Sequence, residues 1–293
     1  MIYRHSHSIL GINYHGDPHN FPYRIWPTLT NNERDPYGRK KVLNMIPQME
    51  FDLLFFLHDS FILDFLPTLL PNLRTHHKTP FKSILYFPVD SVLKPEWGKN
   101  IDPADYIVAY SKFGRDQSLK VLPHREDMTI IPHGVNSAEY FPIPQEEIKA
   151  FRKQYFGPFA DYFIITNVNR NQQRKDIPRT IAAFKEFRKV VPNSLLYLHM
   201  AIKDQGWDLE QVCKSMELDI TRDVIFPKNF GPNQGYPREI LNKIYNASDV
   251  VTSTTLGEGF GLAWMEALAA RIPVLMPANT MLPEFINDEV GYL

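Results

Sequence analysis

Two glutamates around a short glycine-containing turn are the residues of this chain best suited to bind a phosphorylated ligand. Glu258 and Glu266 are separated by seven residues, and the sequence Gly-Phe-Gly-Leu occupies positions 259–262 between them. Glycines let the backbone turn tightly and approach a ligand, and the free N–H groups at the start of a helix attract a phosphate. Because the segment follows a predicted strand and opens a predicted helix over residues 262–270, we expect a phosphate-binding loop.

Glu266 is expected on an apolar helix face, since Leu262, Ala263 and Ala270 lie three or four residues from it. A carboxylate buried there without a partner costs on the order of several kcal/mol. A ribose or sugar diol, which donates two hydrogen bonds, is one suitable partner, and a core Arg or Lys is the other. Glu258, in the preceding loop, is placed to accept hydrogen bonds from a second sugar.

A polar loop with three cations, at residues 169–176, follows the predicted strand 163–168. Arg170 and Lys175 in this loop can neutralise a diphosphate whose negative charge grows as it leaves a reacting carbon. A run of charges on its own is usually a solvated loop. The cations therefore acquire a functional meaning only together with the two glutamates.

Alternating strands and helices are predicted to position these residues. Short apolar runs recur between segments of helical period, a pattern typical of a parallel sheet covered by helices. Two prolines at positions 142 and 144 predict an extended connector, which divides the chain into two α/β domains, 1–144 and 145–293. Ligands of such sheets bind beyond the carboxyl ends of the strands, so a site is expected in a cleft between the domains. The expected strands are 53–57, 84–87, 106–110, 163–168, 195–200, 250–253 and 274–276, and the expected helices are 178–190, 238–246 and 262–270.

Composition excludes several classes of protein. The chain has 293 residues, of which 44% are hydrophobic and 22% charged, and its formal net charge of -1 provides no positive field for nonspecific binding of nucleic acid. Cys213, the one cysteine, cannot form an internal disulfide, which favours a reducing compartment. The N-terminus lacks the apolar core of a signal peptide, and we expect a cytoplasmic protein without a transmembrane segment.

No metal or other cofactor is expected. The histidines are not accompanied by carboxylates or cysteines at the spacing of metal ligands, and the sequence contains no Asp-x-Asp that would bridge a metal to a diphosphate. Cationic side chains would then carry the charge compensation.

The spacing of Glu258 and Glu266 resembles the E-x7-E motif of the retaining GT-B glycosyltransferases of family 4. The resemblance implies two Rossmann-like domains facing across a cleft. It also implies a nucleotide-diphosphate sugar as donor and a hydroxyl group on a glycan, lipid or protein as acceptor. Further segments that resemble the family are 131–136, 110–114, Arg170 with Lys175 five residues later, and Pro283 with Glu284.

The resemblance also implies roles for individual residues. Glu266 would hold the ribose, Glu258 would contact the transferred sugar, and Arg170 and Lys175 would bind the diphosphate, with the base near residues 224–229. Backbone groups that would bind the sugar and phosphates belong to Phe260, Gly261 and Leu262.

The chain departs from the family pattern at several positions. Asp176 stands where the family commonly has Gly, and residues 278–281 stand where a Gly-rich turn is usual. In the N-terminal half, Asp90 lies near the place where the family often has a His. We find no first strand with a Gly-Gly loop before Gly11 and no final crossing helix after Leu293, so a fragment truncated at both ends is expected.

Acceptor contacts are expected from the N-terminal half. The candidates are Asp17, in a polar loop, His58 and Asp59, which follow the predicted strand 53–57, and Asp90. A His hydrogen-bonded to its neighbouring backbone is the alternative interpretation of His58.

Together these features favour a metal-independent retaining glycosyltransferase, with Arg170, Lys175 and Glu258 as its catalytic residues. One alternative is a noncatalytic nucleotide- or glycan-binding relic. A second is a sugar-nucleotide epimerase or phosphorylase on the same fold.

Overall fold

The computed structural model describes residues 8–11, 23–27, 35, 37–231 and 234–293, and these form two compact units. The first unit comprises the chain up to Pro88, Leu93–Ala109 and Arg115–Thr129. The second comprises Val89–Val92, Tyr110–Gly114 and Ile130–Leu293. The second unit thus begins before the division at residue 144 that the prolines predicted, and it includes two short segments from the N-terminal half.

Hydrogen bonds explain why the connector joins the second unit. Pro142 and Pro144 have no N–H group, and the two N–H groups next to them, of Phe141 and Ile143, donate to the side-chain oxygens of Asn242 and Asn246 at 3.2 and 2.9 Å. The Asn246 amide in turn donates to the Phe141 carbonyl at 2.9 Å. Both asparagines belong to helix α8 (Arg238–Asn246), so the connector is bound along that helix.

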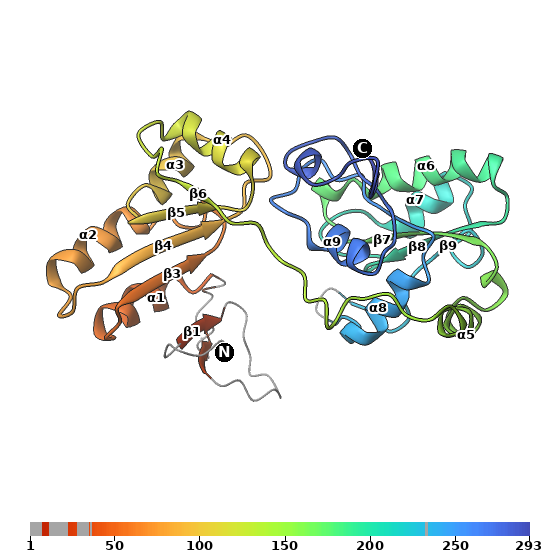
Figure 1. Cartoon of the computed structure of the whole chain (residues 1–293), viewed down its shortest axis with the longest axis horizontal. Coiled ribbons are helices and arrows are strands. Elements are labelled where there is room, and N and C mark those ends of the chain that lie inside the picture. The colour runs from red at the N-terminus through yellow and green to blue at the C-terminus, as the bar shows by residue number, and fades with distance from the viewer. Residues whose placement is uncertain (1–7, 12–22, 28–34, 36, 232–233) are drawn as a thin grey trace. The chain divides into compact units, whose positions relative to one another are not determined.

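The first unit contains a four-stranded sheet with the order β3-β4-β5-β6 (Figure 1). Its strands are β3 (Leu53–Leu57), β4 (Lys82–Phe87), β5 (Tyr106–Ala109) and β6 (Thr129–Ile130), and its helices are α1 (Arg39–Met45), α2 (Leu66–His76), α3 (Pro95–Ile101) and most of α4 (Lys112–Val121). The first residues of α4, up to Gly114, and the last residue of β6 belong to the second unit. At the N-terminal end, where no first strand with a Gly-Gly loop was expected, β1 (Ser8–Gly11) pairs in parallel with β2 (Arg24–Pro27). In the part of the chain that the structure describes, β1 and β2 form a separate two-stranded sheet.

The second unit is built on a six-stranded sheet with the order β12-β11-β10-β7-β8-β9. All of its strand pairs are parallel. The order is that of a doubly wound Rossmann-like sheet, in which the chain moves outward from β7 in one direction, returns to the other side of β7 with β10, and continues outward. The strands are β7 (Phe163–Val168), β8 (Ser194–His199), β9 (Val224–Ile225), β10 (Val250–Thr252), β11 (Val274–Leu275) and β12 (Gly291–Tyr292).

Helices cover both faces of this sheet (Figure 1). Successive side chains of β8 alternate between the two faces, and all of them are buried. Leu196 and Leu198 pack against α6 (Ile177–Val190) and α7 (Leu209–Ser215). Leu195 and Tyr197 pack on the other side with residues of α5 (Gln145–Phe156) and α8. Continuous burial of a strand is what the apolar run in the sequence predicted.

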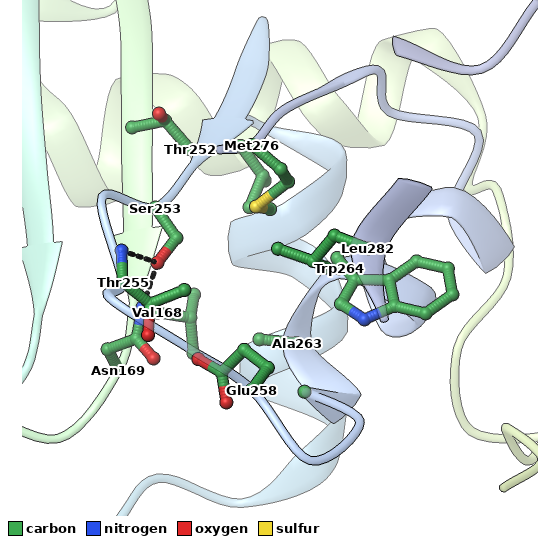
Figure 2. Close-up of a pocket in the computed structure, with 12 residues that line it drawn as sticks. Val168, Asn169, Thr252, Ser253, Thr255, Glu258, Ala263, Trp264, Met276 and Leu282 are labelled. Carbon is green, nitrogen blue, oxygen red and sulfur yellow. Dashed lines mark hydrogen bonds between the residues drawn. The ribbon is translucent and has the colours of Figure 1, made fainter. Parts of the chain in front are cut away.

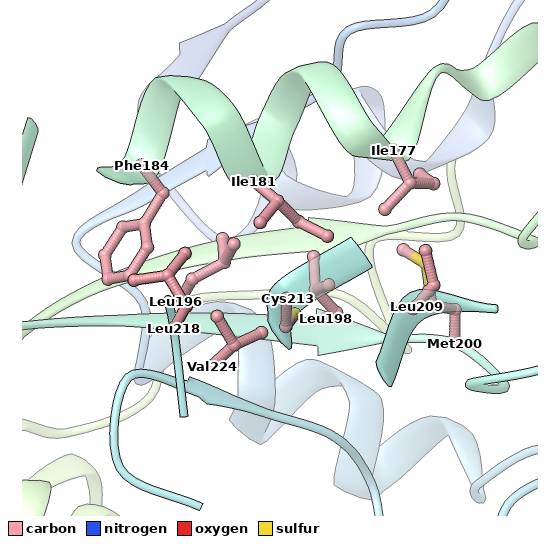
Figure 3. Packing of buried hydrophobic residues seen from close by; sticks show 10 residues of the cluster. All are labelled: Ile177, Ile181, Phe184, Leu196, Leu198, Met200, Leu209, Cys213, Leu218 and Val224. Atoms are coloured by element: carbon pink, nitrogen blue, oxygen red, sulfur yellow. The ribbon is translucent and has the colours of Figure 1, made fainter. Parts of the chain in front are cut away.

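Helix α6 shows how the sequence pattern produces the core. Ile177, Ile181 and Phe184 project from one side of the helix onto β8 (Figure 3), and each is at most 2% exposed. Burial of each such side chain contributes about 1.5–3 kcal/mol. Cys213 lies in the same cluster, and burial raises its pKa to about 11, so this thiol is an unreactive core residue.

His77, just after α2, lies between two backbone carbonyl groups. Its Nδ1 is 2.7 Å from the Thr79 oxygen, and its Nε2 is 2.7 Å from the Met49 oxygen. Carbonyl oxygens only accept, so both contacts are hydrogen bonds only when the imidazole is protonated on both nitrogens. These bonds to Thr79 and Met49 raise the pKa of His77 above 6.5.

We therefore expect His77 to stabilise the protein more at low pH. A group whose pKa is raised by folding contributes its full stabilisation below its unfolded pKa and loses it as the pH rises through the folded value. The urea midpoints of the wild-type protein and His77→Gln should differ most at about pH 6 and converge above the raised pKa. His76→Gln, at the neighbouring exposed histidine, is the control and should show no such pH-dependent difference. A midpoint difference that is constant with pH would contradict this assignment.

Candidate functional site

The candidate site lies where the order of the second sheet reverses, between β7 and β10. The loop after β7 contains a 3-10 turn (Gln173–Lys175), and the loop after β10 leads to helix α9 (Leu262–Ala269). Since β7 and β10 are hydrogen-bonded neighbours, the loops that leave their carboxyl ends lie beside each other. This reversal point is where open α/β sheets bind ligands.

Glu258 is the centre of the charged contacts between these two loops. Its side chain is only 8% exposed, and one carboxylate oxygen accepts a hydrogen bond from Lys175 Nζ. The other oxygen lies 3.2 Å from Arg174 Nη1, which also donates to the Gly257 carbonyl at 2.8 Å. The Glu258 N–H donates to Thr280 Oγ1 at 3.1 Å. The predicted residues Glu258 and Lys175 are therefore brought into direct contact.

The charge of Lys175 depends on this contact. Burial lowers the pKa of Lys175, and the negative charge of Glu258 opposes that shift. A buried ammonium group without a carboxylate would lose its proton more readily. Glu258 therefore keeps a positive charge available at the reversal point of the sheet.

Two non-glycine residues next to the site have the left-handed backbone conformation that favours glycine. Asp176 has a φ of 44° and Thr280 a φ of 47°. The Asp176 carbonyl accepts from Thr254 Oγ1 at 2.8 Å, and its carboxylate pairs with Arg179 at 2.7 Å. Asp176 stands where the family commonly has glycine, and Thr280 lies where a Gly-rich turn is usual. In the structure, each of these two side chains makes a polar contact of its own.

The turn before α9 combines a positive φ with close packing. Gly261 has a φ of 80° and precedes the first turn of the helix, where no side chain caps the N-terminus. Phe260 is buried, and its carbonyl accepts from Trp264 Nε1 at 2.7 Å. The Leu262 side chain is exposed. The backbone contacts with a ligand that the resemblance implies for these three residues stay a prediction.

A pocket opens beside Glu258 (Figure 2). Asn169 and Ser253 supply polar groups from the loops after β7 and β10, while Trp264 and Met276 supply apolar surface. A few polar groups on an apolar wall are typical of small-molecule sites.

Glu266 lies on α9, where its carboxylate accepts a hydrogen bond from Tyr245 Oη at 2.7 Å. From the sequence, a core Arg or Lys was the alternative partner expected for the Glu266 carboxylate. Among the described residues, no ion pair of Glu266 is found.

Arg170 does not join the Glu258 cluster. Its Nε and Nη2 bind the two carboxylate oxygens of Asp204 at 2.6 and 3.2 Å. The cation that contacts Glu258 beside Lys175 is Arg174 instead, whose only signal in the sequence was its place in the same cationic loop.

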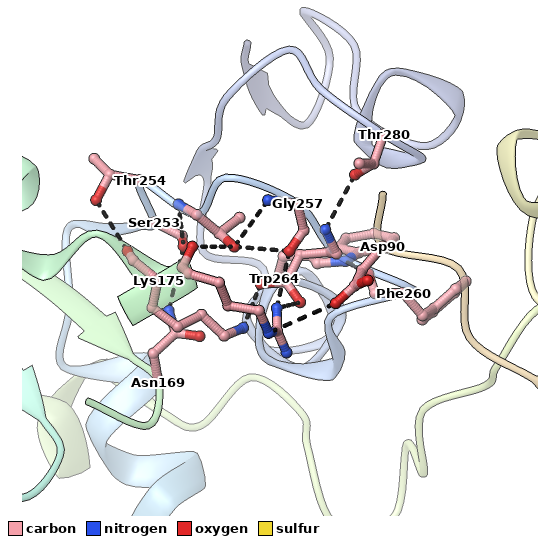
Figure 4. Close-up of polar contacts among 12 residues, drawn as sticks. Asp90, Asn169, Lys175, Ser253, Thr254, Gly257, Phe260, Trp264 and Thr280 are labelled. Atoms are coloured by element: carbon pink, nitrogen blue, oxygen red, sulfur yellow. Dashed lines mark hydrogen bonds and ion pairs between the residues drawn. The ribbon is translucent and has the colours of Figure 1, made fainter. Parts of the chain in front are cut away.

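The acceptor candidates are distributed over different parts of the chain. Asp17 lies outside the described residues. His58 and Asp59 follow β3 in the first unit, where the Asp59 N–H donates to His58 Nδ1 at 2.8 Å, and burial lowers the pKa of His58. Asp90 belongs to the second unit, and its carboxylate lies 3.7 Å from Arg174 Nε (Figure 4). Asp90 therefore groups with the Glu258 cluster and not with the other acceptor candidates.

Glu284 makes a contact within the second unit that the sequence did not indicate. Its carboxylate accepts hydrogen bonds from the N–H groups of Lys112 and Phe113 at 2.8 and 2.6 Å. It thereby caps the start of α4, where a negative charge is favourable. Two segments that were singled out separately, 110–114 and the Pro-Glu pair, are thus neighbours.

The described residues contain no cluster of three or more His, Cys, Asp or Glu side chains that could hold a metal ion. In the same ranges, no helix has both the length and the apolar character needed to cross a bilayer.

Comparison with known proteins relates this chain to one family and to individual proteins of known sequence. The family model for glycosyl transferases group 1 matches residues 147–293. An alpha-monoglucosyldiacylglycerol synthase of Acholeplasma laidlawii is 28% identical over 169 residues, covering 57% of this chain and 40% of that protein. A GDP-mannose-dependent alpha-(1-6)-phosphatidylinositol monomannoside mannosyltransferase of Mycolicibacterium smegmatis is 25% identical over 193 residues, covering 63% and 47%. The chain thus spans about half the length, or less, of these two relatives.

Solved structures confirm the fold class. Anabaena HepE in complex with UDP and glucose matches with a TM-score of 0.68 at 17% identity, over 93% of this chain and 72% of that one. Sucrose-phosphate synthase from Thermosynechococcus elongatus matches with a TM-score of 0.63 at 20% identity, over 83% and 60%. The expected GT-B α/β fold with parallel sheets is therefore confirmed.

We expect the buried contact between Glu258 and Lys175 to be important for stability. Glu258→Gln should lower the free energy of unfolding by about 3–5 kcal/mol, because it leaves an uncompensated buried ammonium group. The double variant Lys175→Met/Glu258→Gln should recover much of that loss, since the unpaired charge is gone. Urea unfolding of the three proteins measures this. A double variant no more stable than Glu258→Gln would contradict the explanation.

Proposed function

The chain belongs to the glycosyl transferases group 1 family, and from this membership we propose that it transfers a sugar from a nucleotide-diphosphate sugar to a hydroxyl acceptor, with retention of anomeric configuration. One observation carries the proposal. Lys175, Arg174 and Glu258 converge at the reversal point of a parallel sheet, next to the uncapped N-terminus of α9. Cations and backbone N–H groups at that point suit a diphosphate, and carboxylates suit the hydroxyl groups of sugars.

In the proposed complex the diphosphate is bound by backbone N–H groups at the start of α9 and by cationic side chains. Lys175 and Arg170 are the cations assigned to it, Glu258 contacts the transferred sugar, and Glu266 accepts from the ribose. A solved structure of Anabaena HepE in complex with UDP-glucose supports a nucleotide-sugar donor for a chain of this fold.

The proposed reaction takes place on one face of the sugar. The bond between the anomeric carbon and the diphosphate oxygen breaks, and the acceptor oxygen forms its bond from the same face. The proton of the acceptor hydroxyl passes to the leaving diphosphate. The protein contributes positive charge where negative charge develops, a form of catalysis that requires no metal ion.

The charge balance of the site determines how the diphosphate is accommodated. Lys175 and Arg174 share Glu258, and Arg170 is paired with Asp204. The Arg170 side chain is 45% exposed, whereas the side chain of its partner Asp204 is only 6% exposed. A diphosphate would therefore share Arg170 with Asp204, and the buried pair of Lys175 and Glu258 persists beside them.

The function is tested by incubating the protein with a panel of UDP- and GDP-sugars and hydroxyl acceptors. Release of nucleoside diphosphate and the anomeric configuration of the product, determined by NMR, are the measurements. Product of the same anomeric configuration as the donor supports the proposal, and inverted product contradicts it.

Removal of either assigned cation should slow this reaction. Arg170→Ala and Lys175→Ala are each expected to lower turnover by about 10²–10³, the effect of losing one preorganised charge-stabilising group. Arg179→Ala is the matched control, because Arg179 pairs with Asp176 on the first turn of α6 and contacts no residue assigned to the donor.

A chelator should leave turnover unchanged if the cations carry the charge of the diphosphate. Activity that is lost in EDTA and restored by Mg²⁺ or Mn²⁺ would contradict the metal-independent mechanism.

A further inference from the structure

Two tyrosines lie at the carboxylate of Glu266. Tyr245, on α8, donates to Glu266 Oε2 at 2.7 Å, and Tyr140, in the segment before the connector, lies near enough for the Glu266 charge to raise its pKa. Tyr245 is fully buried and Tyr140 is 7% exposed. Their rings also contact each other, with centroids 5.9 Å apart.

Both phenols remain protonated and therefore remain donors. Burial raises the pKa of Tyr245 and of Tyr140 well above 10, and the negative charge of Glu266 raises both further. Neither hydroxyl can release its proton near neutral pH, so each must direct it toward an acceptor.

The two tyrosines are held by separate contacts. Tyr245 is fixed in the core between α8 and α9, and the segment after Tyr140 is bound to α8 through Asn242 and Asn246. The surroundings of Glu266 are thus ordered before any ligand is present.

A neutral hydrogen-bond donor leaves the negative charge of a carboxylate uncompensated, whereas a cation neutralises it. An ionised carboxylate has about four acceptor positions on two oxygens, and a bidentate Arg would occupy two of them and neutralise the charge. The phenol of Tyr245 orients the carboxylate and leaves its remaining acceptor positions for hydroxyl groups of a ligand.

We propose that Tyr245, assisted by Tyr140, is a positioning residue that orients Glu266 to accept from both hydroxyl groups of a ribose, and so determines the preference for ribonucleotides. The inference rests on the proposed function. Tyr245 acts through Glu266 and does not itself contact the nucleotide.

The test compares UDP and GDP with their 2′,3′-dideoxy analogues by titration calorimetry. The wild-type protein should prefer the diol-containing nucleotide. Tyr245→Phe should weaken its binding about ten-fold and that of the dideoxy analogue by less than about two-fold, because only the diol uses the orientation of Glu266. A merely structural role of Tyr245 would weaken both ligands equally.

Additional variants separate the contributions of Tyr245, Tyr140 and Glu266 to the preference for the diol-containing nucleotide. Tyr155→Phe removes a hydroxyl group that is bonded to Tyr197 at 2.7 Å, away from Glu266, and should retain the wild-type preference. In a Glu266→Gln background, Tyr245→Phe should have little further effect on the preference, since the two residues act as one unit. If Tyr245→Phe does not fold, Tyr140→Phe provides the same comparison and should reduce the preference in the same direction.

The outcomes distinguish this inference from the function on which it rests. Failure of the wild-type protein to bind any nucleoside diphosphate would overturn the proposed function, and the inference with it. A preference that Glu266→Gln abolishes but Tyr245→Phe and Tyr140→Phe leave intact would overturn the inference alone.

Discussion

Burial of Lys175 together with Glu258 is the constraint on which the arrangement of the second unit depends. Each charge would be costly without the other. Their contact requires the loop after β7 to meet the loop after β10, which is possible because these strands are neighbours in the sheet. Thr280, in the loop after β11, accepts from the Glu258 N–H group and so ties a third loop to this contact.

The surroundings of the two glutamates differ in a way that matches two different tasks. Glu258 is neutralised by cations and nearly enclosed, so its main effect is to keep positive charge at the reversal point of the sheet. Glu266 instead accepts a hydrogen bond from the neutral phenol of Tyr245, and no ion pair of Glu266 is found among the described residues. A motif of two identical residues thus produces one site that is suited to an anion and one that is suited to hydroxyl groups.

The sequence predicted the strands and helices that position the site, because periodicity and apolar runs are local signals. Strand 163–168 and helix 238–246 have the predicted bounds. Side-chain partners were harder to predict, since Arg170 binds an aspartate that follows a different strand, and Tyr245 lies on another helix from Glu266. Such pairs depend on how elements pack, and no spacing along the chain specifies them.

The domain boundary also depends on packing between elements that the sequence pattern does not specify. Prolines at positions 142 and 144 correctly indicated an extended segment, but two asparagine side chains on α8 decide that this segment packs with the second unit. Asp90 was assigned by its position in the chain, whereas the fold places it beside Arg174.

The different partners of Arg170 and Glu266 imply a different sensitivity to ionic strength. The contact of Arg170 with Asp204 joins two full charges at a partly exposed position, where dissolved salt screens the attraction. The contact of Tyr245 with Glu266 joins a buried neutral donor to a half-buried carboxylate, and a hydrogen bond from a neutral group is screened less by salt than a pair of full charges. Salt would thus act on the anion-binding part of the site and leave the geometry around Glu266 unchanged.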